Sequence, residues 1–367
     1  MKYFCNTCKK ELSRNTTFCP NCGAKIKQKK HIDSSKYLLL ITIVLFIVMY
    51  IIGLIAYSDV GFAKPQTFFN MLIDNAGLLI AAAGMTVVMI TGGIDISVGS
   101  VVCLICMILS YGMEKAGMPA VTAILISLLF GIIYGAFQGW CISYMELQPF
   151  IVTLSGLFFC RGVAAMISAN QIAITKNEWF LALSKKDIII PFLKNGINRI
   201  TKEPIRVYIH PSVVIALLTI IVIWFVLKYT RFGRNLFAIG GNEQSALLMG
   251  INVKRTKFFA YVLEGFLASL AGIVWCLNTT AGFVEQAKGF EMEAISSAVI
   301  GGTMLTGGVG TVIGTFFGVL IKATIETLIR CQGTLSSWWN KIVLSTILCF
   351  FIVLQSVFVI VKNRKSK

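Results

Sequence analysis

Four cysteines at the start of the chain have a spacing suited to metal chemistry. They form two Cys-x2-Cys pairs, ten residues apart, in "CNTCKKELSRNTTFCPNCG": Cys5, Cys8, Cys19 and Cys22. Tetrahedral Zn²⁺ takes four thiolates, and two such turns present them in pairs. The alternative, two disulfides, needs an oxidising compartment. The lysines between Lys25 and Lys36 favour a cytoplasmic, reducing location, so the spacing predicts one structural zinc.

This segment resembles a zinc ribbon, although Lys9 follows Cys8 where such ribbons often carry glycine. About two dozen residues cannot form a core of their own, so metal binding should supply most of the folding energy. We expect a ribbon over residues 1–24 and a basic cytoplasmic linker over residues 25–36.

Two glycine-rich stretches interrupt strongly apolar runs. "TGGIDISVGS" carries a glycine pair followed by Asp95 and Ser97, and "AVIGGTMLTGGVGTVIGT" carries two glycine pairs; the residues of interest are Gly92, Gly93, Asp95, Ser97, Gly301, Gly302, Gly307 and Gly308. Backbone that leaves helix within a membrane must be satisfied by protein or by water in a cavity. Such breaks indicate a transport pathway, or close helix packing through small residues. We expect Asp95 to accept hydrogen bonds from amides at the restart of the helix.

The loop over residues 228–257 contains a short predicted helix. A Gly-Gly turn precedes Asn242, a good N-cap residue, and Gly250 ends the following "EQSALLM". A short helix in a loop of this kind suits docking into a groove on a partner, or lies on the membrane surface. The candidate docking residues are Gly240, Gly241, Asn242, Glu243, Ala246 and Gly250.

Few other polar residues lie within apolar segments, and we expect each to face the protein interior. They are Asp74, Arg161, Glu264, Lys322 and Glu326. Lys322 and Glu326 are four residues apart and can pair on one helix. Arg161 needs a carboxylate on another helix, contact with water, or a route to the membrane surface.

Trp338 and Trp339 could face a sugar or belong to an interfacial aromatic belt.

The elements that position these residues are apolar helices. Of 367 residues, 56% are hydrophobic and 13% are charged, and apolar runs long enough to cross a bilayer recur along the chain. The sequence predicts an all-α polytopic membrane protein with about ten transmembrane helices behind the ribbon. The expected segments are 37–57, 68–90, 97–113, 119–143, 149–169, 211–228, 258–278, 294–306, 309–329 and 341–361. The eighth is short and could be half of a re-entrant pair.

Basic residues predict the orientation. The net charge of +17 gathers in the N-terminal linker, the loop 228–257 and the C-terminal tail, which places all three in the cytoplasm. Ten crossings agree with that arrangement. One loop disagrees: residues 170–210 are external in this scheme, yet they also carry an excess of basic residues. The charge is thus a topology signal, and we expect no nucleic-acid partner.

The three stretches "TGGIDISVGS", "AIGGNEQSALLMGINVKR" and "AVIGGTMLTGGVGTVIGT" resemble, in order, signature stretches of ribose/galactose-type permeases of ABC sugar importers. "RGVAAMISANQIAI" and "GTLSSWWNK" further resemble a permease subunit of galactofuranose transporters. The resemblance covers residues 37–363, leaving 364–367 as a basic cytoplasmic tail. The chain departs from the family pattern at its N-terminus, because these permeases do not usually begin with a zinc ribbon.

The resemblance implies a subunit of a bacterial cell (inner) membrane importer. Its partners would be a second permease subunit, homo- or heterodimeric, a cytoplasmic ATPase that uses ATP, and an external binding protein that delivers a monosaccharide. The helix at Asn242–Gly250 would be the ATPase-coupling helix. The chain has no GxxxxGK[ST] phosphate-binding loop, so we expect no enzyme activity. Two alternatives remain: an ion-coupled secondary transporter that uses Asp95 or Glu264, and a membrane-anchored zinc-ribbon sensor.

Overall fold

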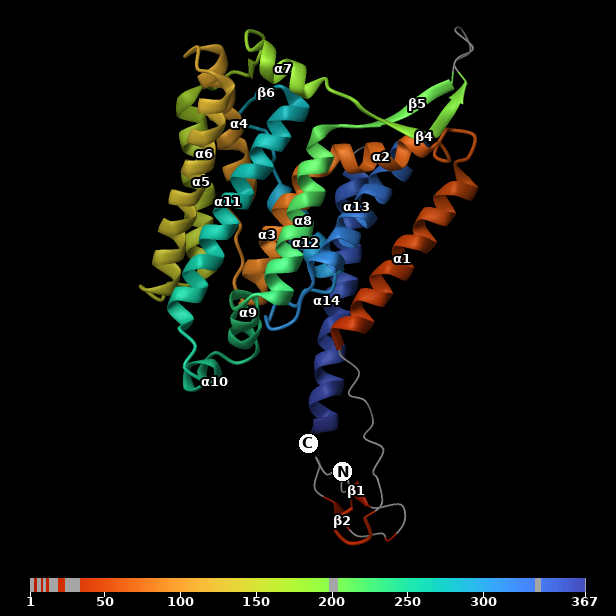
Figure 1. Cartoon of the computed structure of the whole chain (residues 1–367), viewed down its shortest axis with the longest axis vertical. Helices are drawn as coiled ribbons and strands as arrows, with labels where there is room; N and C mark the ends of the chain where they lie inside the picture. Colours follow the sequence, from red (N-terminus) through yellow and green to blue (C-terminus); the bar gives the residue numbers. More distant parts are fainter. Residues whose placement is uncertain are drawn as a thin grey trace.

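The computed structural model describes residues 3–4, 8, 11–12, 19–23, 34–197, 204–333 and 338–366. Figure 1 shows a bundle of helices that run between two ends, with α10 at the lower end and β4 and β5 at the upper end. We call these the α10 end and the β4 end. The long apolar helices are α1 (Ser34–Ala56), α5 (Ala120–Ser143), α6 (Pro149–Ile167), α8 (Pro211–Tyr229), α11 (Val253–Thr279) and α13 (Val312–Gln332).

These six helices are long and apolar enough to cross a membrane. The predicted span 68–90 is two helices instead, α2 (Pro65–Asp74) and α3 (Ala76–Ile90), bent by 56° at Asn75. Together they can form a seventh span. Pro65 begins α2 because proline fits the first turn of a helix. The chain is therefore a multi-pass helical membrane protein.

Three more of the ten expected segments correspond to helices outside these six, namely α4, α12 and α14. α4 (Val98–Glu114) is 17 residues long, and α14 (Trp338–Ser366) begins before the predicted 341. α12 (Phe290–Ile300) has only 11 residues, where 294–306 was expected. At about 1.5 Å per residue, α12 is too short to cross the hydrocarbon core by itself.

Glycines allow α5 and α11 to pack closely. Gly131 and Gly135, one turn apart on α5, face Gly265 and Tyr261 of α11, and a Cβ on either α5 glycine would overlap that backbone. This is the small-residue packing that membrane helices use. α11 also contacts α3 and α4, and the main buried core is formed by these helices together with residues of α8, α12 and α13.

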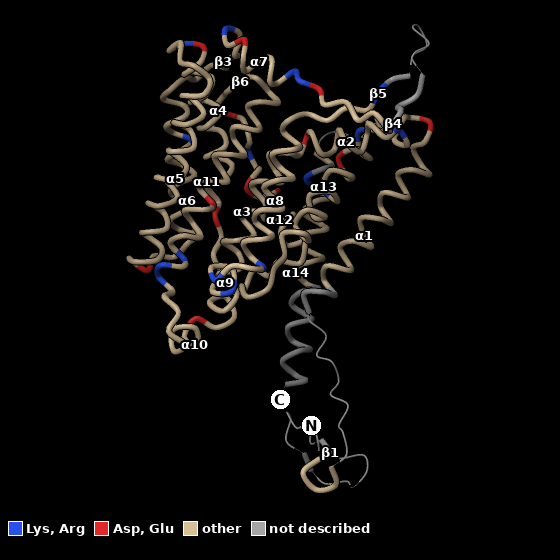
Figure 2. The backbone as a smooth tube through the Cα atoms, viewed as in Figure 1, with Lys and Arg blue, Asp and Glu red and all other residues tan. Residues whose placement is uncertain are grey.

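The loop 170–210 contains secondary structure that the sequence did not indicate. β3 (Ile172–Ala173) pairs with β6 (Ala281–Gly282), the helix α7 spans Glu178–Ser184, and β4 (Ile188–Ile197) pairs with β5 (Pro204–Ile209). β1 (Tyr3–Phe4) pairs with β2 (Glu11–Leu12) near the N-terminus. Figure 2 shows charged residues mainly near the two ends of the bundle, with some along the helices between them.

Candidate functional site

The two glycine-rich stretches meet in space at the α10 end. α3 ends at Ile90 and α4 begins at Val98, while α12 ends at Ile300 and α13 begins at Val312. The amide of Gly308 donates a 2.8 Å hydrogen bond to the carbonyl of Ile90. Gly92, Gly307 and Gly308 all have positive φ, which glycine adopts without strain. The breaks thus form one contact, which we call the glycine junction.

The third sequence motif contacts this junction directly. α9 (Arg231–Gly241), a helix that the sequence analysis did not predict, ends there. A Cβ on Gly240 would overlap both the Ile90 carbonyl and the Gly308 amide. A Cβ on Gly308 would lie 2.9 Å from backbone atoms of Gly241. Three segments far apart in the sequence therefore meet where only glycine fits.

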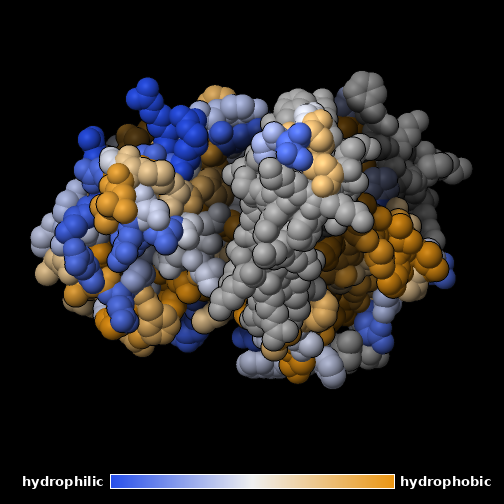
Figure 3. Space-filling model, turned by 90° about the horizontal axis from the view of Figure 1, so that it is seen from below, coloured by the Kyte–Doolittle hydropathy of each residue, from blue (hydrophilic) through white to orange (hydrophobic). Residues whose placement is uncertain are grey.

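α10 (Glu243–Leu248) is the short helix predicted in this loop. The Asn242 side chain accepts a 2.8 Å hydrogen bond from the Ser245 amide, and Gly250 has φ +79°. Ala246 is buried with Ile239 and Val253. The opposite face projects Leu247, Leu248 and Met249 outward, and Leu248 is 89% exposed. Figure 3, viewed from this end, shows hydrophilic side chains gathered on the α9 and α10 side.

Asp95 lies in the first break and is buried. Its Oδ1 accepts hydrogen bonds from the backbone amide of Ser97 at 2.8 Å and the Ser97 hydroxyl at 2.6 Å, just before α4 begins. Gln138 of α5 donates to the same hydroxyl at 3.0 Å. The carboxylate is therefore held by local donors rather than left open to a cavity.

Two polar residues do not lie where the sequence analysis expected. Among the described residues, Arg161 forms no ion pair with a carboxylate within 4.0 Å; its Nη1 donates to the backbone carbonyls of Val284 and Gln286, both at 2.6 Å. Carbonyls of irregular backbone were not among the partners considered. Asp74 is exposed rather than interior, and it contacts Arg330 at 3.2 Å. Glu264 is fully buried against Gly84 as expected.

A cavity of about 470 Å³ opens where α2 meets α3. The ends of α11 and α13 and the starts of α8 and α12 also line it, which places it toward the β4 end. Its walls combine aromatic, amide and charged side chains, among them Asn75, Trp275, Asn278, Phe290, Glu293 and Lys322. We call it the Lys322 cavity.

Lys322 is the most heavily coordinated side chain of this cavity. Its ammonium lies 2.8 Å from Glu326, the predicted pair, and 3.0 Å from Glu293 of α12. It also donates to Asn75 Oδ1 at 3.1 Å. Lys322 thereby connects the bend between α2 and α3 to α12 and α13. Glu293 was not among the residues expected to pair with Lys322, although an acidic residue at the start of an apolar segment could have indicated it.

Trp338 and Trp339 do not line the Lys322 cavity. Both are exposed at the start of α14, and the Lys341 ammonium lies 4.7 Å from the centre of the Trp338 ring. Exposed tryptophans beside a lysine suit the interfacial aromatic belt, the alternative considered for them.

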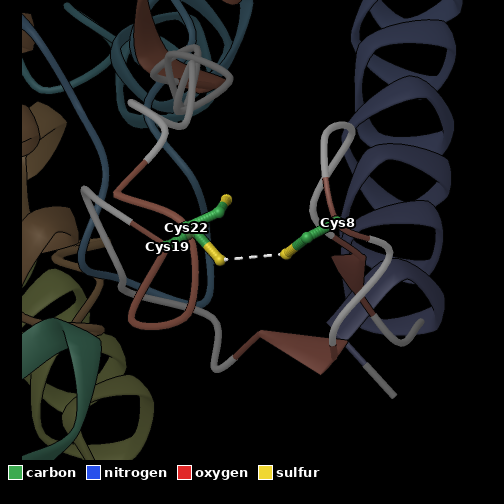
Figure 4. Close-up of side chains that lie close together, drawn as sticks. All are labelled: Cys8, Cys19 and Cys22. Carbon is green, nitrogen blue, oxygen red and sulfur yellow. Dashed lines mark hydrogen bonds between the residues drawn. The ribbon is translucent and has the colours of Figure 1, made fainter.

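Three of the four predicted zinc ligands lie together. The sulfurs of Cys8, Cys19 and Cys22 are all within 4.8 Å of one another, and those of Cys8 and Cys19 are 3.5 Å apart (Figure 4). Hydrogen bonding to the Asn21 amide lowers the pKa of the Cys19 thiol, which favours the thiolate that a metal binds. Cys5 lies outside the described residues.

Comparisons with known proteins match almost the whole membrane part. A family model described as "Branched-chain amino acid transport system / permease component" matches residues 67–352. The inner membrane ABC transporter permease protein YjfF of Escherichia coli is 41% identical over 89% of this chain and 95% of its own length. No solved structure matches the chain.

Two further relatives carry a substrate in their names. The fructose import permease protein FruG of Bifidobacterium longum is 34% identical over 93% of this chain and 96% of its own length. The ribose import permease protein RbsC of Escherichia coli is 32% identical over 85% and 92%.

These relatives are ABC transporter or import permeases, so the alternative of an ion-coupled secondary transporter is wrong. The family resemblance drawn from the three motifs is confirmed. The chain belongs to the family described as branched-chain amino acid transport system / permease component, and it is a multi-pass membrane permease rather than an enzyme.

Proposed function

We propose that this chain is the transmembrane permease subunit of an ABC importer for a monosaccharide of the ribose, galactose or galactofuranose class. The names of the fructose and ribose relatives support the substrate class. The observation that carries the mechanism is the glycine junction, because it joins both helix breaks to the loop that carries α10.

α10 is the proposed docking element for a separate ATPase. Its buried side anchors it through Ala246, while Leu247, Leu248 and Met249 offer an exposed apolar face. An amphipathic helix of this kind can insert into a groove on a partner. Asn242 and Glu243 fix its position: Asn242 caps it, and Glu243 pairs with Lys257 at 2.7 Å.

Movement of α10 would reach the Lys322 cavity through two helices. α3 and α12 each have one end at the glycine junction and the other beside the cavity. A displacement of Gly240 presses on Ile90 and Gly308, because no space separates their backbones. Packed helices transmit such shifts as rigid elements. Gly92, Gly93, Asp95, Ser97, Gly301 and Gly302 would then be the hinge of the pathway.

We propose that the chain crosses the bacterial inner membrane ten times, with α12 and the glycine-rich backbone after it together forming one crossing, and that both termini lie in the cytoplasm. Basic side chains at the α10 end, including Arg231, Arg234 and Arg255, support that side as cytoplasmic. In this arrangement residues 37–363 form the permease domain, residues 25–36 and 364–367 are cytoplasmic, and a second permease subunit and an external binding protein complete the importer.

We also propose that residues 1–24 bind one structural Zn²⁺ through Cys5, Cys8, Cys19 and Cys22. With Zn–S bonds of about 2.3 Å, tetrahedral sulfurs are about 3.8 Å apart. The three described sulfurs are already within 4.8 Å of one another, so the donor set fits. Residues beyond this ribbon carry the permease function.

The test is reconstitution. The chain co-reconstituted with its ATPase, its second permease subunit and its binding protein should accumulate a labelled monosaccharide only with ATP. Leu248→Glu should abolish coupling while insertion persists, because a charge in the docking face costs desolvation. Met145→Glu, at an exposed residue in the neighbouring loop, is the matched control. Accumulation by this chain alone, driven by an ion gradient, would contradict the proposal.

A further inference from the structure

The Lys322 cavity has the chemistry of a binding site whose cations are already committed. A lysine ammonium has three N–H donors. Those of Lys322 have three acceptors within reach: Asn75, Glu293 and Glu326. At the rim, Arg330 is paired with Asp74. His210, which also lines the cavity, lies 3.2 Å from a carboxylate oxygen of Asp187. Each of these three basic groups is therefore already paired with an acidic one.

The charge of the cluster also disfavours anions. Lys322 carries one positive charge against the two carboxylates of Glu293 and Glu326, which leaves one net negative charge. Lys322 is 9% exposed and Glu326 is 18% exposed, so water screens this charge less than it would at the surface. A phosphate or carboxylate that entered the cavity would be repelled by the net negative charge of this cluster.

The groups that remain available are suited to hydroxyls. One oxygen of Glu293 and one of Glu326 take part in no hydrogen bond among the described residues. Trp275 also lines the cavity, and its Nε1 is buried and has no acceptor in the described part of the chain. A buried donor without an acceptor costs free energy that a ligand oxygen would recover.

The shape fits the same class of ligand. About 470 Å³ lies within the range of small-molecule sites. Trp275 and Phe290 meet edge to face, with centroids 4.9 Å apart, and form an apolar wall. The C–H face of a sugar ring can pack on such a wall while its hydroxyls reach the carboxylates and the indole N–H.

We propose that the Lys322 cavity binds an uncharged polyhydroxylated solute, a monosaccharide, and rejects sugar phosphates and amino acids. An amino acid would leave its carboxylate without a cationic partner here. The inference rests on the proposed function and adds to it the site of recognition and the charge selectivity.

The test measures binding to the full-length chain in lipid nanodiscs, without the binding protein, by scintillation proximity with labelled ribose, fructose and galactose. At least one sugar should bind saturably. Trp275→Phe should weaken its Kd about tenfold, since it removes one hydrogen-bond donor and keeps a ring. Trp140→Phe, at an exposed tryptophan on α5 outside the cavity, should leave Kd unchanged.

Selectivity gives an independent measurement. The phosphate ester of the bound sugar and leucine should not displace it from the wild type at a hundredfold excess. Glu293→Gln neutralises the cluster and should let the phosphate ester compete. Equal Kd values for Trp275→Phe and wild type, no saturable binding, or displacement of the sugar by leucine would overturn the inference. The proposed function would still stand if the complete importer accumulated sugar, and would fall if it did not.

Discussion

At the scale of single residues, Gly240 and Gly241 have different roles despite being neighbours. A Cβ on Gly240 would overlap the Ile90 carbonyl and the Gly308 amide, whereas a Cβ on Gly241 would have no atom within 4 Å. Only the first glycine is required by close approach. Within this pair, the space around Gly240 excludes a Cβ, whereas the space around Gly241 would accept one.

We expect Gly240→Ala to separate α9 from the glycine junction and to reduce uptake at least tenfold. Overpacking of this kind costs about 1–3 kcal/mol, so the protein should still insert. Gly241→Ala is the control and should retain uptake within about twofold. Initial uptake rates in vesicles with equal amounts of inserted protein give the answer. Equal loss in both variants would show that packing at the junction is not the cause.

The ion pairs around the Lys322 cavity differ in burial and should differ in energy. Lys322→Ala leaves Glu293 and Glu326 without their cation, and removal of one partner of a buried pair costs about 3–5 kcal/mol. Arg330→Ala breaks a pair whose side chains are 62% and 47% exposed, worth about 0–1 kcal/mol. Thermal unfolding in detergent should therefore show a large drop in Tm for the first variant and little change for the second.

At the scale of elements, the N-terminal ribbon should be an independent unit held by metal. We expect close to one zinc per chain by elemental analysis after gentle purification. Cys22→Ser removes one of the clustered thiols and should lower the zinc content strongly. Cys349→Ser, at an exposed cysteine on α14, is the control and should leave it unchanged. A zinc-free wild type would refute the metal site.

The broken helices are the elements that link the two ends of the bundle. α3 starts at the Asn75 bend beside the cavity and ends at the glycine junction. α12 also starts beside the cavity, at Phe290, and ends where the second glycine-rich stretch begins. Helices of 15 and 11 residues are shorter than a full crossing. We propose that they shift as short rigid pieces relative to α11, which packs closely on α5.

At the scale of the whole molecule, the two ends should face opposite sides of the membrane. Met249 on the α10 side and Trp179 of α7 are both exposed, and α7 lies near the β4 end (Figure 1). In a background with Cys22 and Cys349 replaced by serine, an impermeant maleimide should label Trp179→Cys in intact spheroplasts. Met249→Cys should be labelled only after permeabilisation. The reverse pattern would invert the proposed orientation.

Local signals in the sequence were enough to predict the membrane class, the family and most of the helices. Apolar runs of about twenty residues, the N-cap at Asn242 and the Lys322–Glu326 spacing are local signals, so they can be interpreted without a fold. The helical breaks were also visible, because glycine pairs and a carboxylate disrupt an apolar helix at the positions where they occur.

Tertiary structure alone decided which of these segments meet. The hydrogen bond from Gly308 to Ile90, the contact of Gly240 with both, and the coordination of Lys322 by Glu293 and Asn75 join residues between 29 and more than 200 positions apart. Arg161 donates to backbone carbonyls of a non-helical segment, and Asp74 is exposed. Neither position could be predicted, because both depend on contacts between segments distant in the sequence. Side-chain spacing along one helix fixes neighbours within a turn or two, whereas contacts between helices depend on how the whole bundle packs.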